Sequence, residues 1–165
     1  MKKYKIYIDT SVISHLDAPD VPDRQTDTLQ LWKEIKEGKY EVYISTVVLE
    51  EINQCAEPKK TNLIDFLNQI DFTIIQPKDN EEIKNLENSI INQKILTEKS
   101  RDDCTHIACA VVNECDMIVS WNFKHMVNIR TINGIRAINI SNGYKMIDIY
   151  PPVSLIALKG DNNDE

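Results

Sequence analysis

The chain has 165 residues, the usual length of one domain, and can therefore bury a sizeable hydrophobic core. Its 42% hydrophobic and 27% charged residues are ordinary for a folded protein, so disorder is excluded over most of the length. The net charge of −7 excludes a broad basic surface for nucleic acid, although it allows a local basic patch.

Short apolar segments rich in β-branched or aromatic residues predict buried strands. In chain order these are residues 4–8, 41–44, 72–75 and 117–119, with a weaker fifth candidate at 146–149. Helical patterns lie between them at residues 29–35 (ending at Gly38), 47–56, 62–70, 79 to about 96, and 102–114. Residues 127–144 show no clear pattern.

Strands joined by crossover helices indicate a mainly parallel sheet with helices on both faces. We therefore expect one three-layer α/β/α domain, Rossmann-like and of about five strands, over residues 1–159, followed by a disordered acidic tail at 160–165.

The sequence shows no targeting or membrane segment. No run approaches 18 apolar residues, and the apolar stretch before Asp9 is too short for a signal peptide. The four cysteines form no CxxC pair and lie in otherwise apolar segments, as reduced core thiols do. A cytoplasmic protein without membrane contact is the expectation.

Polar residues stand where predicted strands end and a crossover helix begins. Asp9 directly follows the first strand, Asn122 follows the fourth, and Asp103 begins the helix that leads into the fourth. Because the carboxyl ends of parallel strands and the starts of the crossover helices share the edge at which open α/β sheets bind ligands, we expect these side chains to be neighbours.

The helix after the second strand offers two carboxylates, Glu50 and Glu51. At about 100° per residue, Glu50 lies roughly 160° from the centre of the apolar stripe and Glu51 roughly 100°. Glu50 is therefore predicted to face solvent, whereas Glu51 borders the buried face and can point along the sheet edge.

Three carboxylates at one edge repel one another unless a cation neutralises them. Their oxygens suit Mg²⁺ or Mn²⁺, so we predict a divalent metal site formed by Asp9, Glu51, Asp103 and Asn122. Each residue also has a structural alternative: Asp9 as a helix cap, Asp103 in an S-R-D-D capping box, Glu51 as a solvated helix residue and Asn122 as a turn residue.

A second possible metal set is not favoured. Cys104, His106 and Cys109 look like zinc ligands by residue type, but their helical angles direct them to different sides of one helix.

Four segments, in this order, resemble the PIN domain family, which includes the VapC-type toxins of toxin–antitoxin pairs. They are IDTSVISHL, ISTVVLEEI, DCTHIACA and IVSWNFKHM, and the resemblance spans roughly residues 4–126. The family pattern has acids at the positions of Asp9, Glu51 and Asp103, and Asp or Asn at the position of Asn122. Many members have Asp at this last position, so Asn122 lowers the negative charge of the site.

The resemblance implies a doubly wound fold and Mg²⁺- or Mn²⁺-dependent cleavage of RNA. In this hypothesis Asp9, Asp103 and Asn122 hold one metal that activates water, and Glu51 ligates through water or orients the nucleophile. Cations near the same edge would bind substrate phosphates, and the candidates are Lys99, Arg101, Lys124, His125 and Arg130. An antitoxin and a homodimer are the protein partners that the resemblance implies.

Two functional hypotheses stay open. The first is a metal-dependent endoribonuclease, which could be the toxin of a toxin–antitoxin pair, and the three acids favour it. The second is a catalytically silent domain of the same fold that acts as an RNA- or protein-interaction module. Asn122 and the acidic net charge favour this second hypothesis.

Overall fold

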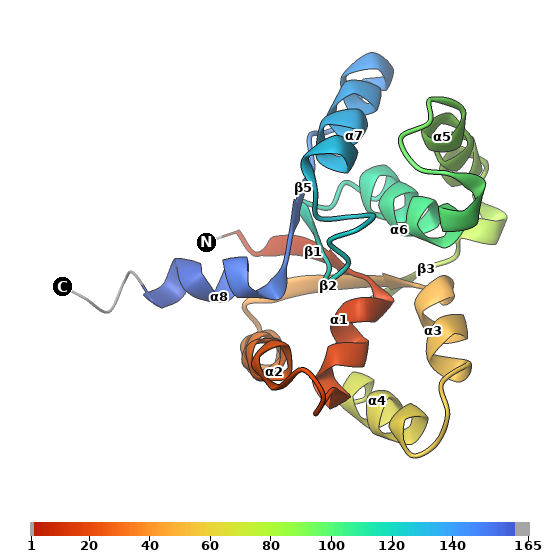
Figure 1. Ribbon diagram of the computed structural model, residues 1–165. Helices are drawn as coiled ribbons and strands as arrows, with labels where there is room; N and C mark the ends of the chain where they lie inside the picture. Colours follow the sequence, from red (N-terminus) through yellow and green to blue (C-terminus); the bar gives the residue numbers. More distant parts are fainter. Residues whose placement is uncertain (1, 161–165) are drawn as a thin grey trace.

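A parallel sheet of five strands lies at the centre of the computed structural model, which describes residues 2–160 (Figure 1). The strands are β1 (Tyr4–Ile8), β2 (Tyr40–Ser45), β3 (Thr73–Ile75), β4 (Met117–Val119) and β5 (Asp148–Tyr150). Their order is β3-β2-β1-β4-β5, and every neighbouring pair is parallel. In the register of the sheet, Tyr7 of β1 lies opposite Tyr43 of β2 and Ile118 of β4.

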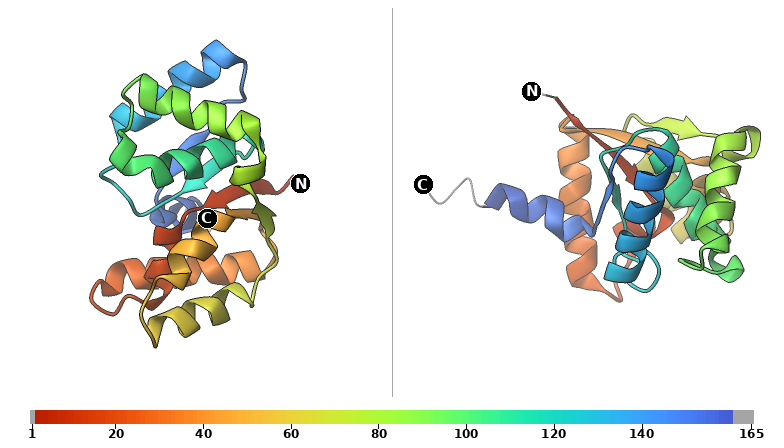
Figure 2. Two further views of the ribbon diagram at one scale, coloured as in Figure 1. Left: turned by 90° about the vertical axis from the view of Figure 1, so that its right-hand side faces the viewer. Right: turned by 90° about the horizontal axis from the view of Figure 1, so that it is seen from above.

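Helices cover both faces of the sheet, which gives the predicted three layers (Figures 1 and 2). One face carries α1 (Thr10–Ser14), α2 (Pro22–Lys36), α3 (Thr46–Asn53), α4 (Lys59–Leu67) and α8 (Pro152–Gly160). The other carries α5 (Glu81–Asn92), α6 (Arg101–Val112) and α7 (Ile129–Asn142). Short 3₁₀ turns lie at His15–Asp17, Pro77–Asp79 and Glu98–Ser100.

Each layer of helices has its own apolar core against the sheet. Successive side chains of a strand point to opposite faces, so Ile6 and Ile8 of β1 pack with Trp32 on one side, while Tyr7 packs with Ile107 on the other. All of these side chains are almost completely buried. The central strand is therefore covered on both faces, which explains its continuous apolar run.

The order of the strands fixes where a ligand site can form. From β1 the chain winds outward to β2 and β3, and it then returns through α5 and α6 to place β4 on the other side of β1. The winding reverses between β1 and β4, and in open α/β sheets the carboxyl ends of two such strands border a crevice. Asp9 follows one of these strands and Ser120 follows the other.

Most predicted elements are confirmed, with shifts at their ends. α2 begins at Pro22, seven residues before the predicted start at residue 29, because a proline in the first turn is compatible with a helix. α5 ends at Asn92 rather than near residue 96, and the fifth strand lies at Asp148–Tyr150 rather than 146–149.

Helices α7 and α8 were not predicted, and α1 was expected only in the alternative in which Asp9 caps a helix. Asn and Gly residues obscured α7, but two of them cap it: Asn128 accepts the Thr131 N–H, and Gly143 ends the helix at a φ of 73°. Gly160 is the last residue of α8, and residues 161–165 of the predicted tail lie outside the described part of the chain. Within residues 2–160, no helix is both long and apolar enough to cross a bilayer.

Candidate active site at the carboxyl edge of the sheet

Asp9 stands where β1 ends and α1 begins, with only 3% of its surface exposed. Its Oδ1 accepts hydrogen bonds from the Ser11 hydroxyl at 2.5 Å and the Val12 N–H at 3.3 Å. Its Oδ2 accepts from the Ser120 hydroxyl at 2.5 Å. Asp9 is thus the cap of α1, as its structural alternative predicted, and it also joins β1 to β4 across the crevice.

Burial makes the ionised form of Asp9 less favourable in free energy. It raises the pKa of this carboxyl above its usual value, although the positive field of His106 and the hydroxyls of Ser11 and Ser120 oppose the rise. A buried carboxyl with a perturbed pKa at a ligand-binding edge is typical of a functional group.

Glu51 reaches the same edge from α3 through a buried chain of polar groups. Its Oε1 accepts from the Thr10 hydroxyl at 3.1 Å and lies 2.9 Å from His106 Nε2. Since an ionised carboxylate can only accept, Nε2 carries a proton. His106 Nδ1 lies 2.6 Å from the Tyr7 hydroxyl, which also bonds Ser45 Oγ at 2.8 Å. We call the linked side chains of Tyr7, His106 and Glu51 the buried relay.

Glu51 and His106 shift each other's pKa in opposite directions. Burial alone would raise the pKa of Glu51, but the hydrogen bond and charge of His106 outweigh it and hold that pKa below its usual value. Burial alone would lower the pKa of His106, but Glu51, Asp9 and Asp103 outweigh it and raise that pKa. The three carboxylates therefore favour the protonated form of the imidazole, against the effect of its burial.

The choice of Glu51 over Glu50 is confirmed as far as its placement goes. Glu50 is exposed and pairs with Lys78 at 3.1 Å, whereas the Glu51 side chain is 33% exposed and lies 2.9 Å from His106 Nε2.

Asp103 lies in the first turn of α6 and is half-buried. Burial raises its pKa, and the negative charges of Asp9 and Glu51 raise it further, against the opposing effect of His106 and His125. The Asp103 carboxylate accepts no hydrogen bond from the described side chains and backbone of residues 2–156, and Ser100 forms no side-chain cap, so the predicted capping box is wrong. Its oxygens are thus the ones left available for a ligand.

Asn122 occupies a turn, as its structural alternative predicted. Its Oδ1 accepts the His125 N–H at 3.0 Å, and its own N–H donates to Ser120 Oγ at 3.0 Å. The side chain that bonds Asp9 after β4 is therefore Ser120, and the metal role of Asn122 stays a prediction.

Sequence reasoning missed the polar residues that hold the carboxylates: Ser11, Ser120, His106 and Tyr7. Two signals were available. His106 is three residues after Asp103 and so shares its helix face, and Ser120 occupies the edge position directly after β4.

The zinc alternative gains no support. Burial raises the pKa of Cys104 and Cys109 to about 12, so both remain neutral thiols, and His106 faces Glu51 and Tyr7 instead.

The predicted phosphate-binding cations do not form one group. Arg101 is paired with Glu98 at 2.6 Å and with Glu87 at 3.5 Å, which neutralises its guanidinium. Lys124, His125 and Arg130 line a hollow of about 240 Å³, whereas Lys99 is exposed. The field of His125 reaches Asp103, so this hollow borders the acidic edge.

The acidic residues fit a hydrated divalent cation. Within residues 2–160, no three His, Cys, Asp or Glu side chains converge into a complete metal site by themselves. Mg²⁺ needs no such cage, because it is commonly held by one or two carboxylates and keeps several waters. Asp103 suits such a ligand role because its carboxylate accepts no hydrogen bond from the described residues. The negative charges of Asp9 and Glu51 also act on it, and a bound cation would neutralise them.

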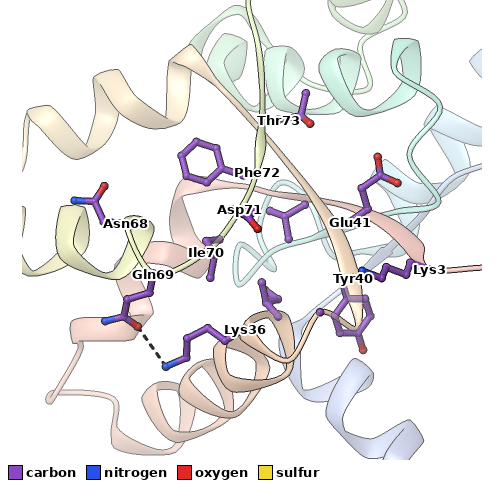
Figure 3. Close-up of a pocket in the computed structure, with 13 residues that line it drawn as sticks. Lys3, Lys36, Tyr40, Glu41, Asn68, Gln69, Ile70, Asp71, Phe72 and Thr73 are labelled. Atoms are coloured by element: carbon purple, nitrogen blue, oxygen red, sulfur yellow. Dashed lines mark hydrogen bonds between the residues drawn. The ribbon is translucent and has the colours of Figure 1, made fainter.

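A larger hollow, of about 490 Å³, lies at the opposite, amino edge of the sheet (Figure 3). It is lined by the start of β2 and the segment before β3, and Lys36 donates to Gln69 at 3.3 Å across its side. The charged residues around it are exposed, and it contains no group of buried carboxylates.

The fold and the site define a doubly wound α/β protein with acids at the point where the winding reverses. The PIN domain family matches residues 5–124, and the chain therefore belongs to this family. PIN domains are in general nucleases.

A solved structure shares the fold. It is the crystal structure of VapBC2 from Rickettsia felis bound to a DNA fragment from their promoter, with 18% identity and a TM-score of 0.51. The match covers 73% of this chain and 89% of that one. No curated protein matches the chain.

Proposed function

We propose that this PIN domain is a metal-dependent endoribonuclease that hydrolyses RNA phosphodiester bonds. The observation that carries the proposal is that Asp9, Glu51 and Asp103 lie at the carboxyl edge of the sheet, where the charges of Asp9 and Glu51 raise the pKa of Asp103. Among the side chains of residues 2–156, no lysine or arginine forms an ion pair with any of the three, and Glu51 pairs with His106 at 2.9 Å.

Each acidic residue has a role that its surroundings support. Asp9 and Asp103 would hold Mg²⁺ or Mn²⁺, and Asn122 could add its amide oxygen. The bound ion would supply Lewis acidity that lowers the pKa of water and polarises the phosphate. Glu51, which is held by Thr10 and His106, would ligate the ion through water or orient the attacking water.

The test uses labelled RNA incubated with the purified protein and Mn²⁺ or Mg²⁺. We expect cleavage that EDTA abolishes and that Asp9→Asn reduces by at least about 100-fold, because even partners of metal ligands are worth 10- to 100-fold. Asp71→Asn, an exposed aspartate at the amino edge, is the matched control and should cleave normally. Cleavage that survives Asp9→Asn would contradict the proposal.

One observation favours the alternative of a catalytically silent interaction module. The amide oxygen of Asn122 already accepts a backbone N–H, so the fourth position of the site contributes little negative charge. Under this alternative the protein would bind RNA in the assay above without cutting it at any metal concentration.

We also propose that a small antitoxin controls the nuclease in the cytoplasm. The likeness of the fold to the VapBC2 complex supports this partner. Cleavage by the free protein should then disappear when the antitoxin is bound.

A further inference from the structure

Three side chains form a separate group beside the acidic edge. Trp121 and Phe123 flank Asn122, and their ring centroids are 6.3 Å apart. The guanidinium of Arg24, in the first turn of α2, lies 5.3 Å from the centroid of each ring. We call Arg24, Trp121 and Phe123 the aromatic platform.

One ring of the aromatic platform is buried and held in place, and the other is partly exposed. Trp121 is only 6% exposed, and its indole N–H donates to the Thr28 hydroxyl at 2.8 Å, so packing and a buried hydrogen bond hold its ring. Phe123, by contrast, is 44% exposed. The Phe123 ring thus remains partly in solvent, while the buried Trp121 holds the segment after β4 in place.

Arg24 is a cation without an acidic partner. Within residues 2–160 it forms no ion pair, although the chain carries 26 acidic residues against 19 basic ones. Contact with aromatic faces stabilises a guanidinium and orients it without using its N–H donors. Those donors remain available for an anion, and phosphate matches their geometry.

The platform is connected to Asp9 by hydrogen bonds. The Trp121 N–H donates to Ser11 Oγ at 2.9 Å, and the Ser11 hydroxyl donates to Asp9 Oδ1 at 2.5 Å. His15 adds a second link, because its Nδ1 lies 2.6 Å from the Ser11 carbonyl oxygen and its ring lies 5.6 Å from that of Trp121. A ligand on the platform would therefore sit in a defined position relative to the acids.

We propose that the platform is a nucleotide-binding subsite in which Phe123 stacks on an unpaired base and Arg24 binds a neighbouring phosphate. The proposal rests on the proposed nuclease function and adds how its substrate is held. Base–aromatic stacking requires a base that is out of a duplex, because bases within a helix have no free face. Stacking accepts every base, so the subsite selects single-stranded RNA with little sequence preference.

The experiment measures binding without cleavage. A fluorescein-labelled single-stranded RNA of about 12 nucleotides is titrated with the unaltered chain in EDTA, which withholds the metal that cleavage requires, and affinity is read from fluorescence anisotropy. Under these conditions Phe123→Ala should weaken binding by roughly 5- to 150-fold, the range for loss of one stacked base. Phe123→Trp should retain the affinity, and Ile129→Ala, which removes an exposed apolar side chain on α7, is the matched control.

Two further measurements separate the base from the phosphate. Phe123→Ala should leave the affinity for a blunt duplex of the same sequence unchanged. Arg24→Gln should weaken binding of the single strand and reduce the slope of log affinity against log salt by about 0.7, the value for one phosphate contact on a single strand.

Equal affinity of the single strand for Phe123→Ala and its parent would overturn the proposal, and would leave the platform as a candidate protein contact. So would failure of the parent to bind the single strand at all. A failure of the nuclease function looks different, because it appears as absent cleavage by the unaltered chain with Mn²⁺ while these affinities are unaffected.

Discussion

The two edges of the sheet place charged side chains in opposite ways. At the amino edge the larger hollow, about 490 Å³, is surrounded by Lys3, Glu41 and Asp71, all exposed (Figure 3). At the carboxyl edge Asp9 and His106 are buried, and they shift each other's pKa. Burying ionisable groups costs free energy, whereas leaving them in water costs none.

This difference shows that the size of a hollow is a poor guide to chemistry in this protein. The hollow at the amino edge is the larger of the two, but the charged side chains around it are exposed to solvent. The carboxyl edge carries carboxylates that are buried or half-buried, and the fold compensates for the cost of burying them with the buried relay and the hydroxyls of Ser11 and Ser120. Perturbed groups of this kind gather at functional sites.

The largest expected effect concerns neighbouring aspartates on α6. Asp103→Asn should reduce the rate of RNA cleavage at least about 100-fold, since it removes a charged ligand of the metal. Asp102→Asn should leave the rate unchanged, because Asp102 is exposed and its charge stays in solvent. The measurement is the initial rate of cleavage of labelled RNA with Mn²⁺. An equal loss of rate in both variants would show that the half-buried and the exposed aspartate do not differ in function.

Metal binding should stabilise the protein through the carboxyl edge alone. With Mn²⁺ at about 100 times its dissociation constant, the free energy of unfolding should rise by about 2.7 kcal/mol. Urea denaturation with and without Mn²⁺ measures this gain. Asp103→Asn should lose it and Asp71→Asn should keep it, whereas loss in the Asp71 variant would locate the ion at the wrong edge.

The buried relay should contribute to both stability and activity. His106→Leu leaves Glu51 and the Tyr7 hydroxyl without their shared partner, so we expect a loss of about 1–3 kcal/mol in unfolding free energy. Cleavage should fall about 10- to 100-fold at saturating Mn²⁺, as for other groups that orient a site residue. Glu50→Gln, which breaks only an exposed ion pair, should change stability by less than about 1 kcal/mol. Full activity in the His106 variant would show that Glu51 needs no such support.

The smallest effect concerns the repulsion itself, in protein free of metal. Burial and the neighbouring acids raise the pKa of Asp103, so its ionised form is less favourable in the folded than in the unfolded chain. This penalty is fully present well above the folded pKa and disappears as pH falls below the usual value of 3.8. Asp103→Asn should therefore raise Tm at neutral pH, by no more than about 2–4 °C for half-buried groups in a chain of this size.

Thermal melts in EDTA across the acidic range test the sign of this effect. The gain should shrink as pH falls through the folded pKa of Asp103. A Tm that drops in the variant at neutral pH would mean that the acids do not repel one another.

Much of the fold, and the placement of Asp9, Glu51 and Asp103 at one edge of the sheet, could be predicted from local patterns. Asp9 and Asp103 follow from their positions at the ends of elements, and Glu51 follows from its angle on α3. The limits were equally local: Asn and Gly residues obscured α7, although Asn128 and Gly143 cap it. The side chain of Asn122 bonds a nearby backbone N–H, which no periodicity predicts.

The sequence by itself determined the alternation of strands and helices, the parallel sheet and the edge at which the acids lie. These depend on residue spacing, which the chain carries along its own length. Only the tertiary structure decided that Ser120 bonds Asp9 across 111 positions, that His106 bonds Glu51 across 55, and that Arg24 rests on Phe123. Such pairs form because whole elements pack against one another, and their partners are set by the order of the strands and the faces that the helices cover.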